Sequence, residues 1–235
     1  MADQDATPAP NTYSQLFSLA VHEFRTPVSV VGGYLRMLQR DTETPLGERQ
    51  RKMIAEAEKS CARLVSLIGE LSEIAKLEDP LVTLKEEAFD LFAVLREVAG
   101  ETREADDRGV QLKTRGAASG AALKGDLVRI HGALGALLRA ALREQQDNAT
   151  VVAECRLTRD GATKTAVIVI AKDDEVERAL TAAPLLFDEK RGGLGLALPI
   201  ARRVIERHGG RVWSPPSEKV GFGSKSSVVI SIPVA

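Results

Sequence analysis

Two neighbouring apolar rows in residues 48–77 constrain the fold more than any other feature of the sequence. One row keeps helical spacing and comprises Met53, Ala57, Ser60, Leu64, Leu67, Leu71 and Ile74. The second row repeats every seven residues and comprises Ile54, Cys61, Ile68 and Ala75. One row would suit a contact between two helices, but two adjacent rows form a broad apolar face that a single helical hairpin cannot cover. We therefore expect a four-helix bundle made by two chains, a homodimer in which each chain contributes one hairpin.

The other helix of the hairpin is predicted for residues 14–40, where apolar residues recur mostly at three- and four-residue steps. Pro27 lies inside this segment and should bend the helix, because proline removes one backbone donor. The hairpin is expected to span residues 13–79, since the Asp-Pro pair at its end is a combination that stops helices. Residues 1–12 contain two prolines and several small polar residues, and they are expected to form a disordered leader.

Residues 80–235 change to alternating strand and helix patterns, which predict an α/β sandwich with helices on one face of a mixed sheet. Strands are expected at residues 83–85, 110–114, 151–158, 165–171, 211–213 and 226–232. Helices are expected from the N-cap Asp90 to about Asp107, from Gly125-Asp126 to about Glu144, and over residues 194–208. The dipeptide Asp160-Gly161 predicts a hairpin between the third and fourth of these strands.

The composition excludes several classes of function. A formal net charge of -1 provides no basic field for nucleic acid. No apolar run approaches the roughly 20 residues that span a bilayer, and the polar N-terminus lacks the basic start and apolar core of a signal peptide. Cys61 and Cys155 both fall within apolar patterns, which favours buried thiols over a disulfide. Together these features predict a cytoplasmic protein without membrane insertion.

Residues 17–38, FSLAVHEFRTPVSVVGGYLRML, contain a histidine followed by a carboxylate, a threonine and a proline. The core HEFRTP, residues 22–27, and the second helix ending in LIGELSEIAKLED resemble the dimerisation and histidine-phosphotransfer domain of two-component sensor histidine kinases. A zinc motif of the HExxH type does not fit, because Thr26 stands where the second histidine would be. The resemblance implies that His22 accepts a phosphoryl group and that a response-regulator receiver domain is the partner.

The chemistry of these side chains agrees with such a role. A neutral imidazole at His22 offers a free ring nitrogen for in-line attack at pH 7. Glu23 can accept the proton of the other ring nitrogen and stabilise the charge that develops. Thr26 lies four residues after His22 and shares its helix face. In the family, a hydroxyl or amide at this position helps to orient water for removing phosphate from a partner's aspartate.

His131 and His208 have no comparable setting, and His208 is expected to cap the C-terminus of its helix.

Residues 192–198, GGLGLAL, precede a helix that ends in HGG, and Gly125-Asp126 precedes an earlier helix. These features resemble the ATP-binding catalytic domain of the same kinases, which has the GHKL ATPase fold. The resemblance implies that Asp173 contacts the adenine amine of Mg-ATP. It also implies that phosphate oxygens meet the backbone in the glycine turn before the later helix, at Gly193, Gly195 and Leu196.

Several residues of that nucleotide pattern are replaced. The positions of the magnesium-holding asparagine match Ala136 and Ala140, and alanine has no ligand atom, so no metal ligand is assigned. Asp173 is followed by DEVE, residues 174–177, where the family has two glycines, and the added carboxylates would repel a triphosphate. The lid, residues 187–192, is short. We expect a degenerate site in which Mg-ATP binding and autophosphorylation are weak or lost.

Three functions remain open on these grounds. In the first, a dimeric phosphotransfer protein exchanges phosphoryl groups between His22 and a response-regulator aspartate. The second is a sensor-less autokinase that uses Mg-ATP. The third is a non-catalytic pseudokinase that scaffolds a receiver domain, or a phosphatase that acts on it through Glu23 and Thr26. Labelling with ATP, with His22→Ala as the control, separates the second from the others.

Overall fold

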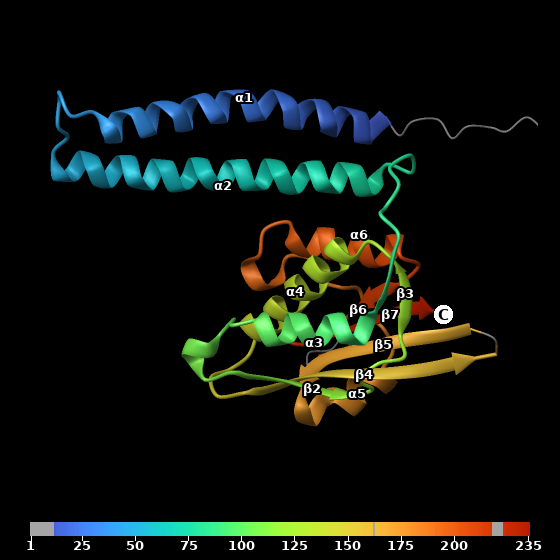
Figure 1. Cartoon of the computed structure of the whole chain (residues 1–235). Coiled ribbons are helices and arrows are strands. Elements are labelled where there is room, and N and C mark those ends of the chain that lie inside the picture. Colours follow the sequence, from blue (N-terminus) through green and yellow to red (C-terminus); the bar gives the residue numbers. More distant parts are fainter. Residues whose placement is uncertain (1–11, 162, 218–222) are drawn as a thin grey trace, which may run out of the picture. The chain divides into compact units, whose positions relative to one another are not determined.

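The computed structural model describes residues 12–161, 163–217 and 223–235, so most of the expected leader lies outside the described residues. The chain divides between Val82 and Thr83 into two compact units. The first unit is a pair of long helices, and the second is an α/β domain (Figure 1).

The first unit confirms the predicted helical hairpin, which consists of α1 (Thr12–Arg40) and α2 (Glu48–Glu78). The turn between them is held by Asp41, whose carboxylate accepts the N–H groups of Glu43 and Thr44. The helix α2 begins after Gly47, whose N–H donates to the Gln50 side chain over 3.0 Å. Helix α1 continues through Pro27.

The two apolar rows of α2 have different surroundings. The row with seven-residue spacing faces α1, and Cys61, Ile68 and Ala75 of that row are buried. Cys61 also donates from its thiol to the carbonyl oxygen of Val28 on α1, over 3.1 Å. The other row is exposed from Met53, at 64%, to Leu64, and its members Leu67, Leu71 and Ile74 are half-buried. Further large apolar side chains are exposed along the hairpin: Leu16, Phe17, Leu19, Phe24, Val30, Val31, Tyr34, Met37, Leu38, Leu64 and Val65.

The second unit is built on a five-stranded sheet with the order β2-β4-β5-β7-β6. Its strands are β2 (Gln111–Gly116), β4 (Thr150–Asp160), β5 (Thr163–Lys172), β6 (Arg211–Trp213) and β7 (Val228–Val234). Only β2 and β4 pair in parallel, so the sheet is mixed, as predicted. The predicted hairpin is confirmed, because β4 pairs with β5 from Val151↔Lys172 to Asp160↔Thr163. A separate two-stranded sheet joins β1 (Glu87–Asp90) to β3 (Ala122–Gly125).

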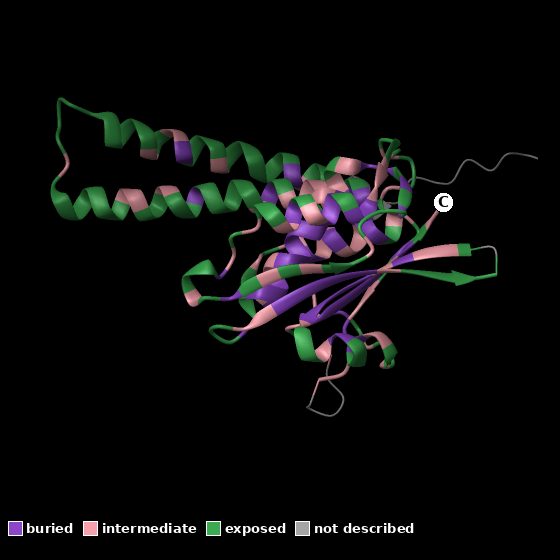
Figure 2. Cartoon of the chain, turned by 60° about the horizontal axis from the view of Figure 1, so that its bottom comes forward, coloured by how far each residue is buried: buried purple, intermediate pink, exposed green. Residues whose placement is uncertain are grey.

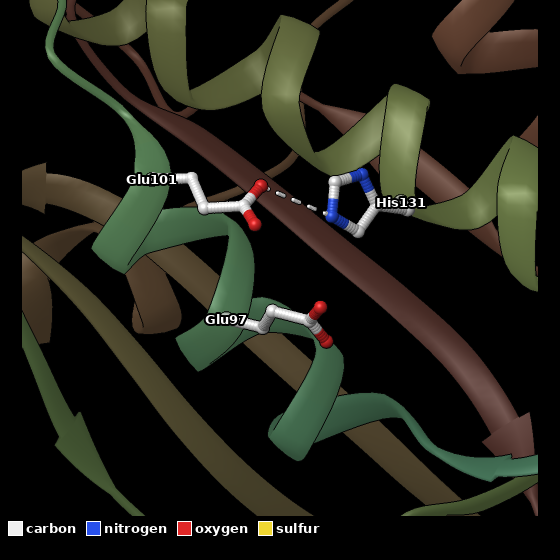
Figure 3. Close-up of side chains that lie close together, drawn as sticks. All are labelled: Glu97, Glu101 and His131. Atoms are coloured by element: carbon white, nitrogen blue, oxygen red, sulfur yellow. Dashed lines mark ion pairs between the residues drawn. The ribbon is translucent and has the colours of Figure 1, made fainter.

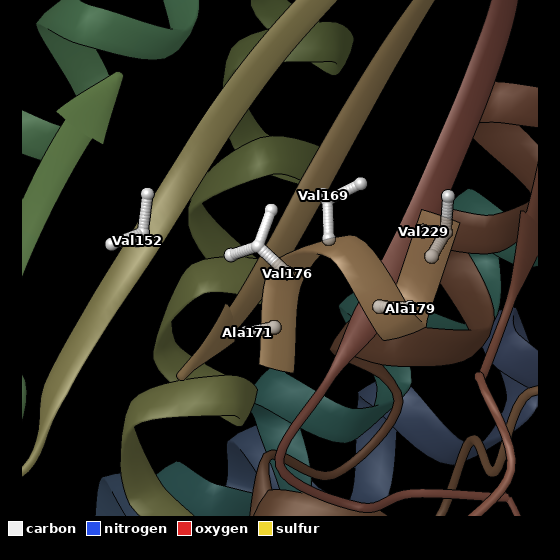
Figure 4. Close-up of a cluster of buried hydrophobic side chains, with 6 residues drawn as sticks. All are labelled: Val152, Val169, Ala171, Val176, Ala179 and Val229. Atoms are coloured by element: carbon white, nitrogen blue, oxygen red, sulfur yellow. The ribbon is translucent and has the colours of Figure 1, made fainter. Parts of the chain in front are cut away.

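Helices cover both faces of the large sheet, which corrects the prediction of helices on one face only. The longer helices α3 (Leu91–Glu101), α4 (Leu127–Arg143) and α6 (Ala197–Arg207) lie on one side (Figure 1). The short α5 (Val176–Thr181) lies on the other side, where Val176 and Ala179 pack on a cluster of buried valines and alanine (Figure 4). Four consecutive residues of β5, 168–171, are therefore fully buried, and the central sheet forms the core of the domain (Figure 2).

Strand ends differ from the predictions by one or two residues, and three predicted elements differ by more. Residues 83–85 do not form a strand, because the Lys85 N–H donates to the Asp126 carboxylate and strand pairing starts only at Glu87. The helix capped by Asp90 ends at Glu101 and not near Asp107, and the N–H and hydroxyl groups of Thr102 turn back to the Val98 carbonyl. The helix predicted over residues 194–208 begins at Ala197 instead of Leu194.

Both cysteines are free and buried, as predicted, and burial raises the pKa of Cys155 to about 11. Within the described part of the chain, no helix has both the length and the apolar character that crossing a bilayer requires.

Candidate functional site

The candidate phosphoacceptor lies on α1, with its side chain in solvent. The side chains of His22 and Glu23 are 78% and 72% exposed, and 3.8 Å separates His22 Nδ1 from Glu23 Oε1. Val21, immediately before them, is buried against the hairpin, so it fixes which way this turn of the helix faces. Thr26 is exposed one turn later on the same continuous helix. The three residues predicted for this site are therefore brought together on an accessible surface.

Such an arrangement suits a nucleophilic imidazole. A distance of 3.8 Å is too long for a direct hydrogen bond, but a carboxylate that close favours the proton on the nearer ring nitrogen, Nδ1. The lone pair of Nε2 is then available for attack. Exposure matters as much as basicity, because an attacking nitrogen has to approach a phosphorus atom in line with its leaving group.

The glycine turn before α6 is the second candidate site. Gly192, Gly193 and Gly195 all have positive φ angles, between 60° and 73°, which glycine adopts without strain. Leu196 occupies the N-cap position of α6, and its own apolar side chain makes no capping hydrogen bond. The predicted residues Gly193, Gly195 and Leu196 thus form one continuous turn that leads into a helix N-terminus.

This turn is fastened to the end of α4. The Gly192 N–H donates to Glu144 Oε1 over 2.9 Å, and the Gly192 carbonyl accepts from Arg143 over 2.9 Å. The backbone of Gly192 also lies directly on Ala140, because a Cβ on the glycine would come 3.1 Å from the Ala140 Cα. Ala136 and Ala140 are both buried and offer no oxygen or nitrogen ligand atom from their side chains.

Asp173, the residue predicted to contact adenine, is engaged elsewhere. Its carboxylate lies 2.6 Å from Arg115 Nη1, and the same guanidinium pairs with Glu154. The network continues from Glu154 through Arg156 to Glu177 on α5. Within the described ranges, neither a hydrogen bond nor an ion pair links Asp173 to the glycine turn. The structure therefore brings together the three turn residues, but it places Asp173 in a surface ion network.

Arg191 is a buried residue that no sequence motif marks. Its side chain is 98% covered, and Nη1 donates to the carbonyl oxygens of Ser224, Lys225 and Ser227 over 2.8 to 2.9 Å. The guanidinium also lies 4.4 Å from the centre of the Phe187 ring, within the range of a cation–π contact. Burial lowers the pKa of Arg191 to about 10, so it remains charged at neutral pH.

The Gly125-Asp126 pair joins α4 to α6. The Asp126 N–H donates to Nε2 of His208 over 2.9 Å, while Nδ1 of that ring lies 2.7 Å from the Val204 carbonyl. This geometry requires a neutral ring with its proton on Nδ1. A Cβ on Gly125 would come 2.3 Å from the His208 ring, so only glycine fits there. The prediction that His208 caps its helix is confirmed.

Asp126 itself caps α4. Its side chain accepts the Arg129 N–H and pairs with the Arg129 guanidinium at 2.8 Å. Burial alone would raise the pKa of Asp126, but these donors, together with the Lys85 N–H, outweigh it and lower the pKa. Gly125 and Asp126 therefore stabilise the packing of α4 and α6 independently of any nucleotide.

Comparisons with known proteins agree with both halves of this description. Residues 12–80 match the His Kinase A (phospho-acceptor) domain, and residues 125–235 match the histidine kinase-, DNA gyrase B- and HSP90-like ATPase family.

Among curated relatives, the sensor-like histidine kinase SenX3 of Mycolicibacterium smegmatis is 31% identical over 224 residues, covering 90% of this chain and 55% of SenX3. The sensor protein GacS of Pseudomonas syringae pv. syringae is 26% identical over 251 residues, covering 100% of this chain and 27% of GacS. The chain thus spans between about a quarter and about half of the length of these relatives.

Solved structures share the fold. Full-length ShkA in complex with AMPPNP superposes with a TM-score of 0.67 at 22% identity, covering 94% of this chain and 46% of ShkA. The histidine kinase ThkA in complex with the response regulator protein TrrA gives 0.53 at 19% identity, covering 94% of this chain and 61% of that chain. With a phosphoacceptor hairpin followed by an ATPase-type α/β domain, the chain belongs to the two-component sensor histidine kinase family.

Proposed function

We propose that this chain is a histidine phosphotransfer protein, in which His22 receives a phosphoryl group from a response-regulator aspartate and returns it to another. The observation that carries the proposal is the contrast between two sites. His22 is exposed beside a carboxylate, whereas the Gly192 backbone lies on Ala140.

The transfer step follows from the geometry at His22. Nε2 attacks the phosphorus atom of the aspartyl phosphate, and an N–P bond forms as the P–O bond to the aspartate breaks. The aspartate leaves as a carboxylate. The ring becomes positively charged while Nδ1 keeps its proton, and the Glu23 carboxylate at 3.8 Å stabilises that charge. The reverse step uses the same groups. Thr26, one turn away, is placed to orient water for the competing hydrolysis.

ATP is not the phosphoryl source in this proposal. The side chains of Ala136 and Ala140 have no atom that could hold magnesium, and Asp173 is paired with Arg115. The Gly192 backbone rests on Ala140, where the family places an amide. The residues present therefore do not fit Mg-ATP.

The proposal includes a homodimer. The row of α2 that contains Met53 and Leu64 is apolar yet exposed in a single chain, and so is a matching set on α1 that includes Leu19 and Val31. Burial of such faces between two hairpins would complete a four-helix bundle. A receiver domain as the partner is supported by the His Kinase A match and by the ThkA–TrrA complex.

A transfer experiment tests the proposal. A receiver domain labelled with phosphate on its aspartate is mixed with the wild-type chain, with His22→Ala and with His131→Ala. We expect acid-labile label on the wild type and on His131→Ala, and none on His22→Ala. Circular dichroism checks that the exposed substitution leaves the helices intact. Equal labelling of wild type and His22→Ala, or no labelling of either, contradicts the proposal.

A second arm offers labelled Mg-ATP without a receiver. We expect no label on His22. If ATP labels the wild type but not His22→Ala, the chain is an autokinase and the proposal is wrong.

A further inference from the structure

Three potential metal ligands that belong to neither site described above converge on the surface of the α/β domain. Glu97 and Glu101 come from α3, and His131 comes from α4 (Figure 3). One ligand atom of each lies within 4.8 Å of the other two. His131 Nε2 is 3.5 Å from Glu101 Oε2.

The backbone holds these residues in place. Glu97 and Glu101 are one helical turn apart, so they share a face of α3. The helix is fixed by the Asp90 cap at its start and by five buried side chains along its other face. His131 directly follows Ile130, which is fully buried in α4. Ligands on packed helices keep their geometry better than ligands on loops.

The charge around the cluster is unbalanced. Two carboxylates one turn apart on a helix repel each other. Six other glutamates of this domain pair with an arginine or lysine, namely Glu86, Glu104, Glu154, Glu177, Glu189 and Glu206. Among the described residues Glu87, Glu144 and Glu175 have no such ion pair, but none of them lies next to a second carboxylate and a histidine as Glu97 and Glu101 do. In the described part of the domain, neither an arginine nor a lysine forms an ion pair with Glu97 or Glu101, although Arg103 and Arg139 line the same recess as Glu101. His131 forms an ion pair with Glu101. A pair of uncompensated carboxylates beside an imidazole attracts a divalent cation.

We propose that Glu97, Glu101 and His131 bind a divalent transition-metal ion of the zinc class. An imidazole nitrogen with two carboxylate oxygens is a donor set that zinc accepts, whereas calcium and magnesium select oxygen ligands. Tetrahedral zinc places its ligands about 3.4 Å apart. Both glutamates are exposed, so their side chains are free to change rotamer towards that spacing.

The site clamps α3 to α4 and keeps one coordination position open. Three protein ligands leave the fourth position of a tetrahedral ion to water or to another ligand. Glu101 and His131 also line a surface recess of about 570 Å³, which the absence of side chains at Gly132 and Gly135 widens. A small ligand therefore has room to reach the bound ion.

Titration of the full chain with zinc alone, followed by calorimetry, tests this site. We expect one ion per chain in the wild type. Because loss of even an outer-shell partner typically costs 10- to 100-fold in affinity, His131→Ala should weaken binding by at least about tenfold. The double variant Glu97→Gln/Glu101→Gln should do the same, and it should fold at least as well as the wild type without metal, because it removes a repulsion. Glu87→Gln, another exposed glutamate of this domain, is the matched control.

His22→Ala is the second control, because among the described residues His22 and Glu23 form the other ion pair between a histidine and a carboxylate. Binding that is lost in His131→Ala and in the double variant but kept in both controls supports the site. No saturable binding in the wild type overturns the proposal, and so does binding that survives His131→Ala.

Discussion

Gly192 lies on Ala140 so closely that a Cβ on the glycine would come 3.1 Å from the alanine Cα and 3.2 Å from its Cβ. The main chain of the glycine turn therefore occupies the space next to α4 where a longer side chain at position 140 would go. Hydrogen bonds from Arg143 and to Glu144 hold the turn in that position.

Replacing Ala140 by the family's asparagine should therefore harm the protein and not repair it. Ala140→Asn forces an amide into a fully buried position against Gly192, and we expect a loss of about 2 to 4 kcal/mol in the free energy of unfolding. Urea unfolding measures this loss. Val128→Asn, at a 72% exposed position on the same helix, is the control and should change little. Stability equal to the wild type, or tight ATP binding by Ala140→Asn, would show that the turn moves aside.

Arg191 should matter for stability although it lies outside the phosphotransfer site. Arg191→Ala removes the donor to three carbonyl oxygens and leaves a cavity beside Phe187. We expect a loss of about 3 kcal/mol or more, since buried carbonyls are left without a partner. Thermal unfolding of Arg191→Ala is compared with Arg178→Ala, an exposed arginine on α5. Equal melting temperatures of the two variants would contradict this role.

Gly125 and His208 should be strongly coupled. Gly125→Ala places a methyl group 2.3 Å from the His208 ring, and overpacking of this kind costs about 1 to 3 kcal/mol. His208→Ala alone loses the hydrogen bond from the Asp126 N–H. The double variant should be no less stable than His208→Ala, because without the ring the methyl group fits. A double-mutant cycle measures the coupling, and simple additivity would refute it.

Acid should remove the stabilising effect of the Asp126 carboxylate. The pKa of Asp126 is lowered in the folded state, with burial opposing the donors that outweigh it. A lowered folded pKa means that the stabilisation is present above the unfolded value of 3.8 and is lost as pH falls through the folded value. The stability difference between wild type and Asp126→Asn should be constant near neutral pH and shrink below about pH 4. Urea unfolding at several pH values measures this difference. A difference that grows as the pH falls would contradict the prediction.

The exposed row of α2 should be the dimer contact. Leu64→Glu places a charge in that row, and we expect it to weaken the dimer while the hairpin within one chain stays folded. Analytical ultracentrifugation gives the dissociation constant. Arg51→Glu, on α2 but outside both rows, should dimerise like the wild type. A wild-type chain that stays monomeric at high concentration would contradict the homodimer.

Elements with strong local patterns were predictable from the sequence. Both hairpin helices, α4 and the β4–β5 hairpin carry their own periodicity and caps, such as Asp126 for α4 and Asp160-Gly161 for the turn. The small β1–β3 sheet was not predictable in this way, because its strands find their partners far along the chain and residues 83–85 look equally extended. The helix α5 was missed because it is only six residues long and follows a run of three carboxylates, residues 173–175, that resembles a loop, although Val176 is fully buried.

The candidate sites show the same difference between local patterns and contacts that join distant parts of the chain. His22, Glu23 and Thr26 are neighbours in one helix, so their spacing alone predicts a shared face. The Asp173–Arg115 pair and the contact of Asp126 with His208 join residues from different elements, and nothing local marks them. The HGG segment and the Gly-Asp pair were each visible in the sequence as separate motifs, but their contact appears only once the chain is folded.

In the homodimer proposed above, the exposed part of the apolar row along α2 makes the complete bundle larger than one chain. If two copies bury that row against each other, the free energy of unfolding of the hairpin depends on the logarithm of the protein concentration. Dilution then lowers the fraction of chains whose His22 lies on a complete four-helix bundle, even when neither a receiver domain nor phosphate is present. In such a dimer the concentration of the protein would itself regulate how much His22 is available for phosphotransfer.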